Sequence, residues 1–86
     1  MKRLLAITLI TMMLLGACAS DPYDSEGIVN QGALDAIKIN RDCADLQSTF
    51  DLNWRRSLVI EAGTLKHKQA IKFVTASDAR MEEVGC

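Results

Sequence analysis

The sequence predicts a small all-α protein built around an antiparallel helical hairpin, and three observations support this prediction. Apolar residues recur at three- and four-residue steps along two segments, about 43–61 and 64–84, which is the spacing of one face of a helix. Gly63 lies between them and leaves only a short turn, so the two helices are expected to be antiparallel neighbours. Cys43 and Cys86 stand at the two outer ends, which meet in such a hairpin.

The first 17 residues have the layout of an export signal. Lys2 and Arg3 form a short positive segment, and residues 4–15 are uncharged and mostly apolar. This apolar run of about twelve residues is shorter than the roughly twenty that a membrane-spanning helix needs. We therefore expect residues 1–17 to be a signal peptide that is cleaved between Ala17 and Cys18.

The end of this signal, Leu15-Gly16-Ala17-Cys18, resembles the lipobox of bacterial lipoprotein precursors. The resemblance implies that the Cys18 thiol receives a diacylglycerol thioether and that the new amine receives an acyl chain such as palmitate. Two or three acyl chains, at about 0.8 kcal/mol per buried CH₂, would attach the protein stably to a membrane. The alternative is an ordinary secretory signal followed by a chance cysteine.

The residue after Cys18 bears on the destination of the protein. Lipoproteins that stay in the inner membrane of Gram-negative bacteria typically carry Asp at this position, and here it is Ala19. By this resemblance we expect the cell outer membrane, with the domain facing the periplasm. In a host without an outer membrane the expected location is the cell membrane.

Residues 18–25 predict a short lipidated tether because they are mostly polar and contain the only Pro. Tyr23 within them suits either a lipid interface or an ordinary loop. Residues 26–39 carry a partial apolar stripe and predict a third helix, which Gly27 and Gly32 weaken by up to about 1 kcal/mol each relative to Ala. A segment that becomes ordered only on docking is the alternative.

The first hairpin helix has a clear start and an apolar stripe. Asp42 is a good N-cap, and Asp45 follows three residues later in the place of a capping-box acid. Four apolar residues then recur at four-residue steps: Leu46, Phe50, Trp54 and Leu58. We expect this stripe to face the core. Four further apolar residues lie outside the expected core: Leu52, Val59, Ile60 and Ile71. They either pack against residues 28–39 or form a surface for a partner.

The second hairpin helix is bounded by Thr64 as its N-cap and by Gly85 as its stop. Its core-facing positions are Ala70, Phe73, Val74, Ser77, Met81 and Val84. The charges at its ends oppose the helix dipole, with residues 66–68 (Lys-His-Lys) at the start and two glutamates at positions 82 and 83 near the end. This mismatch indicates either an ordinary solvated face or a surface used for binding.

Cys43 and Cys86 are the two cysteines that remain after Cys18 takes the lipid. In an oxidising compartment we expect a disulfide between them. Closing a loop of about 43 residues stabilises a protein by roughly 4 kcal/mol in the chain-entropy model, which is a large contribution for a mature chain of 69 residues. Two unpaired thiols, or a Cys86 bonded to another chain, are the alternatives.

Residues 43–86 also resemble small exported bacterial helical-hairpin proteins of unassigned function. The resemblance rests on four short stretches: Cys43-Ala44-Asp45-Leu46-Gln47, Phe50-Asp51, Ser77-Asp78-Ala79-Arg80-Met81 and Gly85-Cys86. It covers the last half of the chain and implies the hairpin fold there, within the small helical domain that we expect at 26–86, and it implies no activity.

Composition and spacing argue against several classes of function. The mature chain has eight basic and eleven acidic residues, so it lacks the positive charge that binds nucleic acid. His67, the only histidine, is expected at the turn end of the hairpin, some 25–30 Å from Cys43, which excludes a Cys–His nucleophile pair. Convergent metal ligands, Gly-rich phosphate loops and nucleophile elbows are also missing from the sequence. We expect no enzyme activity, no catalytic or metal-binding residue, no small-molecule substrate and no cofactor other than the lipid on Cys18.

The leading hypothesis is therefore a membrane-anchored envelope lipoprotein that acts without catalysis, by binding another envelope protein or by supporting the envelope. The alternative is a prophage- or plasmid-encoded exclusion lipoprotein that blocks a surface receptor.

Overall fold

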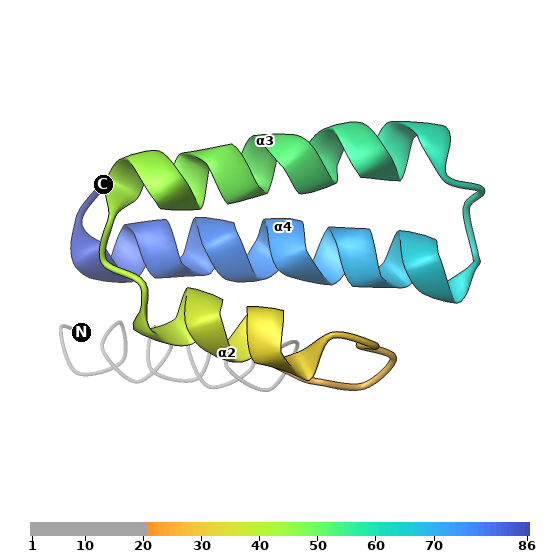
Figure 1. Ribbon diagram of the computed structural model, residues 1–86, viewed down its shortest axis with the longest axis horizontal. Coiled ribbons are helices and arrows are strands. Elements are labelled where there is room, and N and C mark those ends of the chain that lie inside the picture. Colours follow the sequence, from red (N-terminus) through yellow and green to blue (C-terminus); the bar gives the residue numbers. More distant parts are fainter. Residues whose placement is uncertain (1–20) are drawn as a thin grey trace, which may run out of the picture.

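The computed structural model describes residues 21–86 and shows three helices in them. Helix α2 spans Gln31–Ile39, α3 spans Cys43–Val59 and α4 spans Leu65–Val84. Helices α3 and α4 form an antiparallel hairpin, and α2 lies along α4 (Figure 1). The prediction of a helical hairpin with a third helix is confirmed. The predicted signal peptide, its cleavage site and Cys18 lie outside the described residues.

The turn of the hairpin is slightly longer than predicted. Helix α3 ends at Val59 and not at residue 61, because Ile60 takes an extended backbone while its N–H still bonds the Arg56 carbonyl. Helix α4 starts at Leu65, and the Thr64 hydroxyl caps it by accepting from the His67 N–H at 3.2 Å. Gly63 has a φ of 89°, so it acts in the turn itself and not as a helix cap.

Helix α2 is shorter than the predicted 26–39 because residues 21–30 form turns. The Asp21 carboxylate accepts from the Tyr23 N–H at 2.8 Å, and the Asp24 carboxylate accepts from the Glu26 N–H at 3.0 Å. Such side-chain bonds compete with helix formation. Helix α2 therefore begins only after Asn30, whose side chain accepts from the Ala33 N–H at 3.1 Å.

The start of α3 confirms the predicted cap but not the predicted capping box. The Asp42 carboxylate accepts from the N–H groups of Ala44 at 3.0 Å and Asp45 at 3.3 Å. The Asp42 N–H donates to the side-chain oxygen of Asn40 at 2.8 Å, so Asp45 does not receive it. Asp45 instead accepts from the Asn40 side-chain nitrogen at 2.6 Å. The side chain of Asn40 therefore bridges the end of α2 and the start of α3.

The core lies where α4 meets both other helices. It consists of five buried residues: Leu34, Ile37, Leu46, Phe73 and Ala76. The predicted core positions of α4 are confirmed, since Ala70, Phe73, Val74 and Ser77 are buried and Met81 and Val84 pack partly buried against the core.

The predicted core stripe of α3 is confirmed at Leu46, half-buried at Phe50 and wrong at its last two residues. Trp54 is 49% exposed and Leu58 68% exposed, whereas Asn53 and Ser57 are buried. The buried polar groups are satisfied within the helix: the Asn53 amide donates to the Thr49 carbonyl at 2.9 Å, and the Ser57 hydroxyl donates to the Trp54 carbonyl at 2.6 Å. Their burial therefore leaves neither polar group without a partner. Helix α3 is rotated so that Asn53 and Ser57 are buried, while Trp54 and Leu58 of the apolar stripe are exposed.

The open end of the hairpin is closed by the predicted disulfide. Cys43 and Cys86 are bonded, with their Cα atoms 5.7 Å apart. Gly85 turns the chain toward Cys43 with a φ of 84°, and the Cys86 N–H donates to the Met81 carbonyl at 2.9 Å. Gly85 is thus the predicted stop of α4, and it delivers Cys86 to its partner.

Candidate functional site

The segment before α2 is bound to α4 through Tyr23. The Tyr23 hydroxyl donates to a Glu83 carboxylate oxygen, and the other oxygen of that carboxylate lies 3.2 Å from the Arg80 guanidinium. The Nε of Arg80 donates to the Asn40 carbonyl at 2.8 Å. This network, which we call the Tyr23 clasp (Tyr23, Asn40, Arg80 and Glu83), joins the N-terminal segment, the α2–α3 connection and α4.

The environment of Tyr23 changes its ionisation. Partial burial raises the pKa of Tyr23 to about 12, and the hydrogen bond to Glu83 and the charge of that carboxylate act in the same direction. The ammonium of Lys38 also lies 5.9 Å from the centre of the Tyr23 ring, close enough for a cation–π interaction. Tyr23 is therefore bound within the domain, to α4 through Glu83 and to α2 through Lys38.

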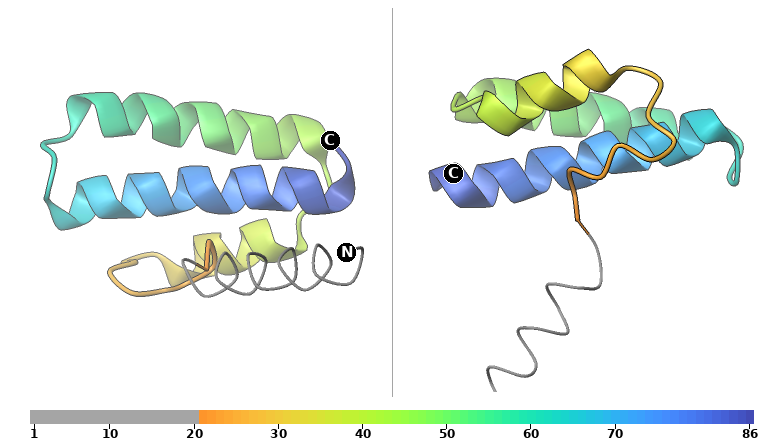
Figure 2. Two further views of the ribbon diagram at one scale, coloured as in Figure 1. Left: turned by 180° about the vertical axis from the view of Figure 1, so that it is seen from behind. Right: turned by 90° about the horizontal axis from the view of Figure 1, so that it is seen from below.

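A second contact holds the beginning of the described chain. The Lys72 ammonium donates to the Asp21 carbonyl oxygen at 3.0 Å. Asp21 borders a shallow hollow on α4 whose other lining residues are His67, Lys68, Ile71, Lys72 and Thr75. Residues 21–25 of the predicted tether thus follow the surface of α4, and in the right view of Figure 2 the segment crosses that helix.

Apolar side chains are exposed on the side of the hairpin away from α2. Arg56 of α3 and Gln69 of α4 border the groove beside α2. Trp54 comes two residues before Arg56, and Ile71 comes two residues after Gln69. At about 100° per residue, each side chain points about 160° away from the groove around its own helix. We define the open face as Phe50, Trp54, Leu58 and Ile71. In the register set by the disulfide, Leu58 lies level with Ile71.

The aromatic residues of the open face are stacked on each other. The rings of Phe50 and Trp54 have centroids 6.5 Å apart and are nearly parallel, with an angle of 9° between their planes. Phe50 is half-buried, Leu58 is mostly exposed and Ile71 is 38% exposed. Exposed apolar residues that share one side of a hairpin are candidates for contact with another molecule.

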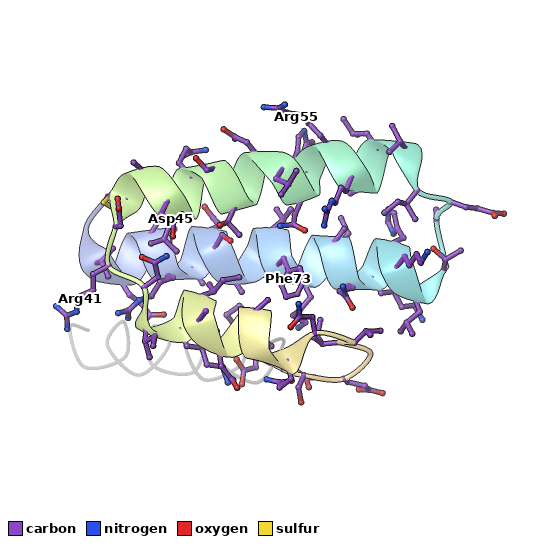
Figure 3. The ribbon with its side chains drawn as sticks, in the orientation of Figure 1. Arg41, Asp45, Arg55 and Phe73 are labelled. Carbon is purple, nitrogen blue, oxygen red and sulfur yellow. A yellow bond between two sulfur atoms is a disulfide. The ribbon has the colours of Figure 1, made fainter. Side chains whose placement is uncertain are left out.

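Two further apolar residues are exposed on the outer side of α3, which is the side that faces away from α4. Leu52 is 50% and Val59 84% exposed, and their seven-residue separation puts them on one side of the helix. Arg55, between them, points away from α4 in Figure 3. Both side chains are thus largely open to solvent, which favours the second predicted outcome, a surface for a partner. Ile60, by contrast, is half-buried.

The groove between α2 and α3 has a mixed lining. Its polar side chains include Asn30, Asp45, Thr49, Arg56 and Gln69, and its apolar ones include Ala33, Ile37 and Phe73. The Gln69 side-chain oxygen accepts from the Val29 N–H at 2.7 Å, and Asn30 caps α2. The lining residues do not bring together a nucleophile and a base.

Comparison with known proteins provides no relative to guide the assignment. The chain matches no protein family, no curated protein and no solved structure at a significant level. Within residues 21–86, three or more potential metal-ligating side chains do not converge anywhere. The helices of this part of the chain are also too short or too polar to span a membrane.

Sequence reasoning missed both the Tyr23 clasp and the open face. The clasp joins residues sixty positions apart. Its only signal in the sequence was the pair of glutamates near the C-terminal end of the last helix, where the helix dipole disfavours negative charge. Glu83 is now accounted for, because it receives Tyr23 and Arg80. The basic residues at the start of α4 are not explained by the fold.

Proposed function

We propose that this protein is a small lipoprotein of the bacterial envelope, anchored through acyl chains on Cys18, which acts without catalysis by binding another envelope protein. The observation that carries the proposal is the order of charge, apolar run and Leu15-Gly16-Ala17-Cys18 at the start of the chain. In a Gram-negative host the anchored domain faces the periplasm from the outer membrane.

Two features of the domain support this proposal. The disulfide between Cys43 and Cys86 suits an oxidising compartment such as the periplasm. The outer side of α3 presents Leu52 and Val59 to solvent, and the buried centre of a protein interface is more apolar than the rest of the protein surface.

Lipidation is tested on the protein purified from the membranes of a bacterial host. Intact mass spectrometry should show a chain that starts at Cys18 and carries diacylglycerol, with or without an N-acyl chain. Cys18→Ser is the matched control, and it should remain unprocessed and lack the lipid. A wild-type chain that starts elsewhere, or that has a free thiol at Cys18, would refute the proposal.

Partner binding is tested by photo-crosslinking in cells. A photo-reactive residue at Val59 should capture one abundant envelope protein, whereas the same residue at the exposed Asp35 of α2 should not. Capture of a phage or conjugation receptor would favour the exclusion lipoprotein. Equal capture from both positions would argue against a specific interface on the outer side of α3.

A further inference from the structure

The open face and the start of the described chain lie close together on the molecule. Asp21 is held by Lys72 and borders the same hollow as Ile71 and His67. Ile71 is also the α4 member of the open face. The chain therefore leaves the domain beside the open face and away from α2 (Figure 2).

Covalent geometry limits how far the domain can move from an anchor on Cys18. Asp21 is the third residue after Cys18, and an extended chain spans at most about 3.6 Å per residue, or roughly 11 Å in all. A lipid on Cys18 would therefore hold Asp21 at the level of the headgroups. The α4 surface around Asp21 would be placed there with it.

The charges near Asp21 suit such a surface. Lys68 and Lys72 line the hollow together with His67, and ammonium groups are attracted to anionic headgroups by about 1 kcal/mol each near the surface. One carboxylate, that of Asp21, also borders the hollow, and it accepts from the Tyr23 N–H. Asp51 and Asp78 lie two helical turns nearer the disulfide than Leu58 and Ile71 do. The hollow itself therefore carries two lysines against one carboxylate.

We infer that the open face rests on the anionic lipid surface in which Cys18 is anchored, with the turn half of the hairpin in contact and the disulfide end tilted away. Trp54 then lies at the boundary between headgroups and acyl chains, where Trp is favoured. Leu58 and Ile71 enter the same layer. The outer side of α3, with Leu52 and Val59, points away from the lipid and stays open to a protein partner. This inference rests on the proposed lipidation of Cys18.

The single Trp of the chain makes the inference directly measurable. The lipidated protein is reconstituted in vesicles of phosphatidylglycerol and phosphatidylethanolamine whose acyl chains carry bromine, a quencher of Trp fluorescence. Trp54 should emit at shorter wavelength than in a Cys18→Ser chain expressed without residues 1–17, which has neither signal nor lipid, and should lose most of its intensity to the brominated lipid. Emission that is quenched only by aqueous iodide would overturn the inference.

A matched reporter separates contact by this face from mere closeness to the membrane. In Trp54→Phe/Leu52→Trp the fluorophore moves to the opposite side of the same helix, and it should be open to iodide and nearly untouched by the brominated lipid. Equal lipid quenching of both reporters would overturn the inference. Circular dichroism establishes that both proteins keep their helices.

A pair of charge substitutions gives a second readout. Leu58→Glu should restore most of the Trp54 intensity in brominated vesicles, because a carboxylate would be forced into the lipid layer. Val59→Glu, one residue away on the outer side, should leave the quenching unchanged. The inverse result would place the outer side of α3 against the lipid.

The failures of the two proposals can be told apart. A protein whose Cys18 carries no lipid does not remain with the vesicles on flotation, and then both the proposed function and the inference fall. A lipidated protein that floats with the vesicles but has an unquenched Trp54 overturns the inference alone.

Discussion

The two sides of the α3–α4 hairpin carry similar apolar residues but have different surroundings. On one side Leu34 and Ile37 of α2 are buried against α4. On the other side Trp54, Leu58 and Ile71 have no such cover within residues 21–86. An apolar stripe therefore indicates a surface whose burial is favourable. It does not indicate whether that surface is covered within the domain or by another molecule.

Both sides of the hairpin depend on its being closed by the disulfide. Removal of the disulfide is therefore expected to have the largest effect on stability. Cys43→Ser/Cys86→Ser should lower the free energy of unfolding by about 4 kcal/mol, because the unfolded chain regains the freedom of a loop of about 43 residues. Denaturant unfolding of the variant and of the wild type measures this difference. An unchanged midpoint would show that helix packing alone closes the hairpin.

Truncation on the covered side should cost far more than the same change on the open face. Leu34 is fully buried, so Leu34→Ala should destabilise the domain by about 2–4 kcal/mol through lost burial and a cavity. Leu58→Ala, a chemically identical change at an exposed position, is the matched control and should cost under about 0.5 kcal/mol. Similar losses for the two variants would mean that the open face is covered within the domain.

The Tyr23 clasp makes the covered side sensitive to high pH. The pKa of Tyr23 is about 12 in the folded protein against an ordinary value of 10. The stabilisation is therefore complete below pH 10 and is lost as the pH rises from 10 to 12. Because Tyr23 is the only Tyr, phenolate absorbance titrates it directly, and the midpoint should fall toward 10 in denaturant.

Two variants test the cause of that shift. Glu83→Gln removes the carboxylate charge and should lower the Tyr23 midpoint while leaving part of the shift, since partial burial is the larger cause. Tyr23→Phe should remove the loss of stability between pH 10 and 12 and should cost under about 1.5 kcal/mol at neutral pH. A Tyr23 midpoint near 10 in the folded wild type would mean that the clasp does not form.

The smallest effect is expected from a polar substitution on the open face. Trp54→Ser, in a Cys18→Ser chain expressed without residues 1–17, should lower the free energy of unfolding by about 1 kcal/mol, because half of the side chain is already in water and the main loss is the stacking on Phe50. A loss of several kcal/mol, measured by denaturant unfolding, would show that Trp54 belongs to the core.

Sequence reasoning succeeded where the signal was local or depended only on connectivity. The caps Asp42 and Thr64, the stop at Gly85 and the spacing of α4 are properties of a few neighbouring residues. The pairing of Cys43 with Cys86 followed from a short turn between two helices of similar length. It failed at the start of α2, where Asp21, Asp24 and Gly27 favour turns over a helix.

The rotation of α3 could not be predicted from the stripe itself. Helical spacing groups Leu46, Phe50, Trp54 and Leu58, but the buried side is Leu46, Asn53 and Ser57. A polar residue can be buried at little cost when its own helix supplies the hydrogen-bond acceptor, as the carbonyls of Thr49 and Trp54 do here. Apolarity therefore did not decide which side of α3 faces α4.

The sequence by itself determined the helices, their order, the closed hairpin and, through residues 15–18, the expectation of a lipid anchor. These depend on interactions between near neighbours or on chain connectivity. The tertiary structure decided which side of α3 is buried, that Tyr23 binds Glu83, and that Asp21 lies beside Ile71. These features depend on how the three helices pack around one core. That packing joins residues distant in the chain, so it does not appear as a periodic pattern in the sequence.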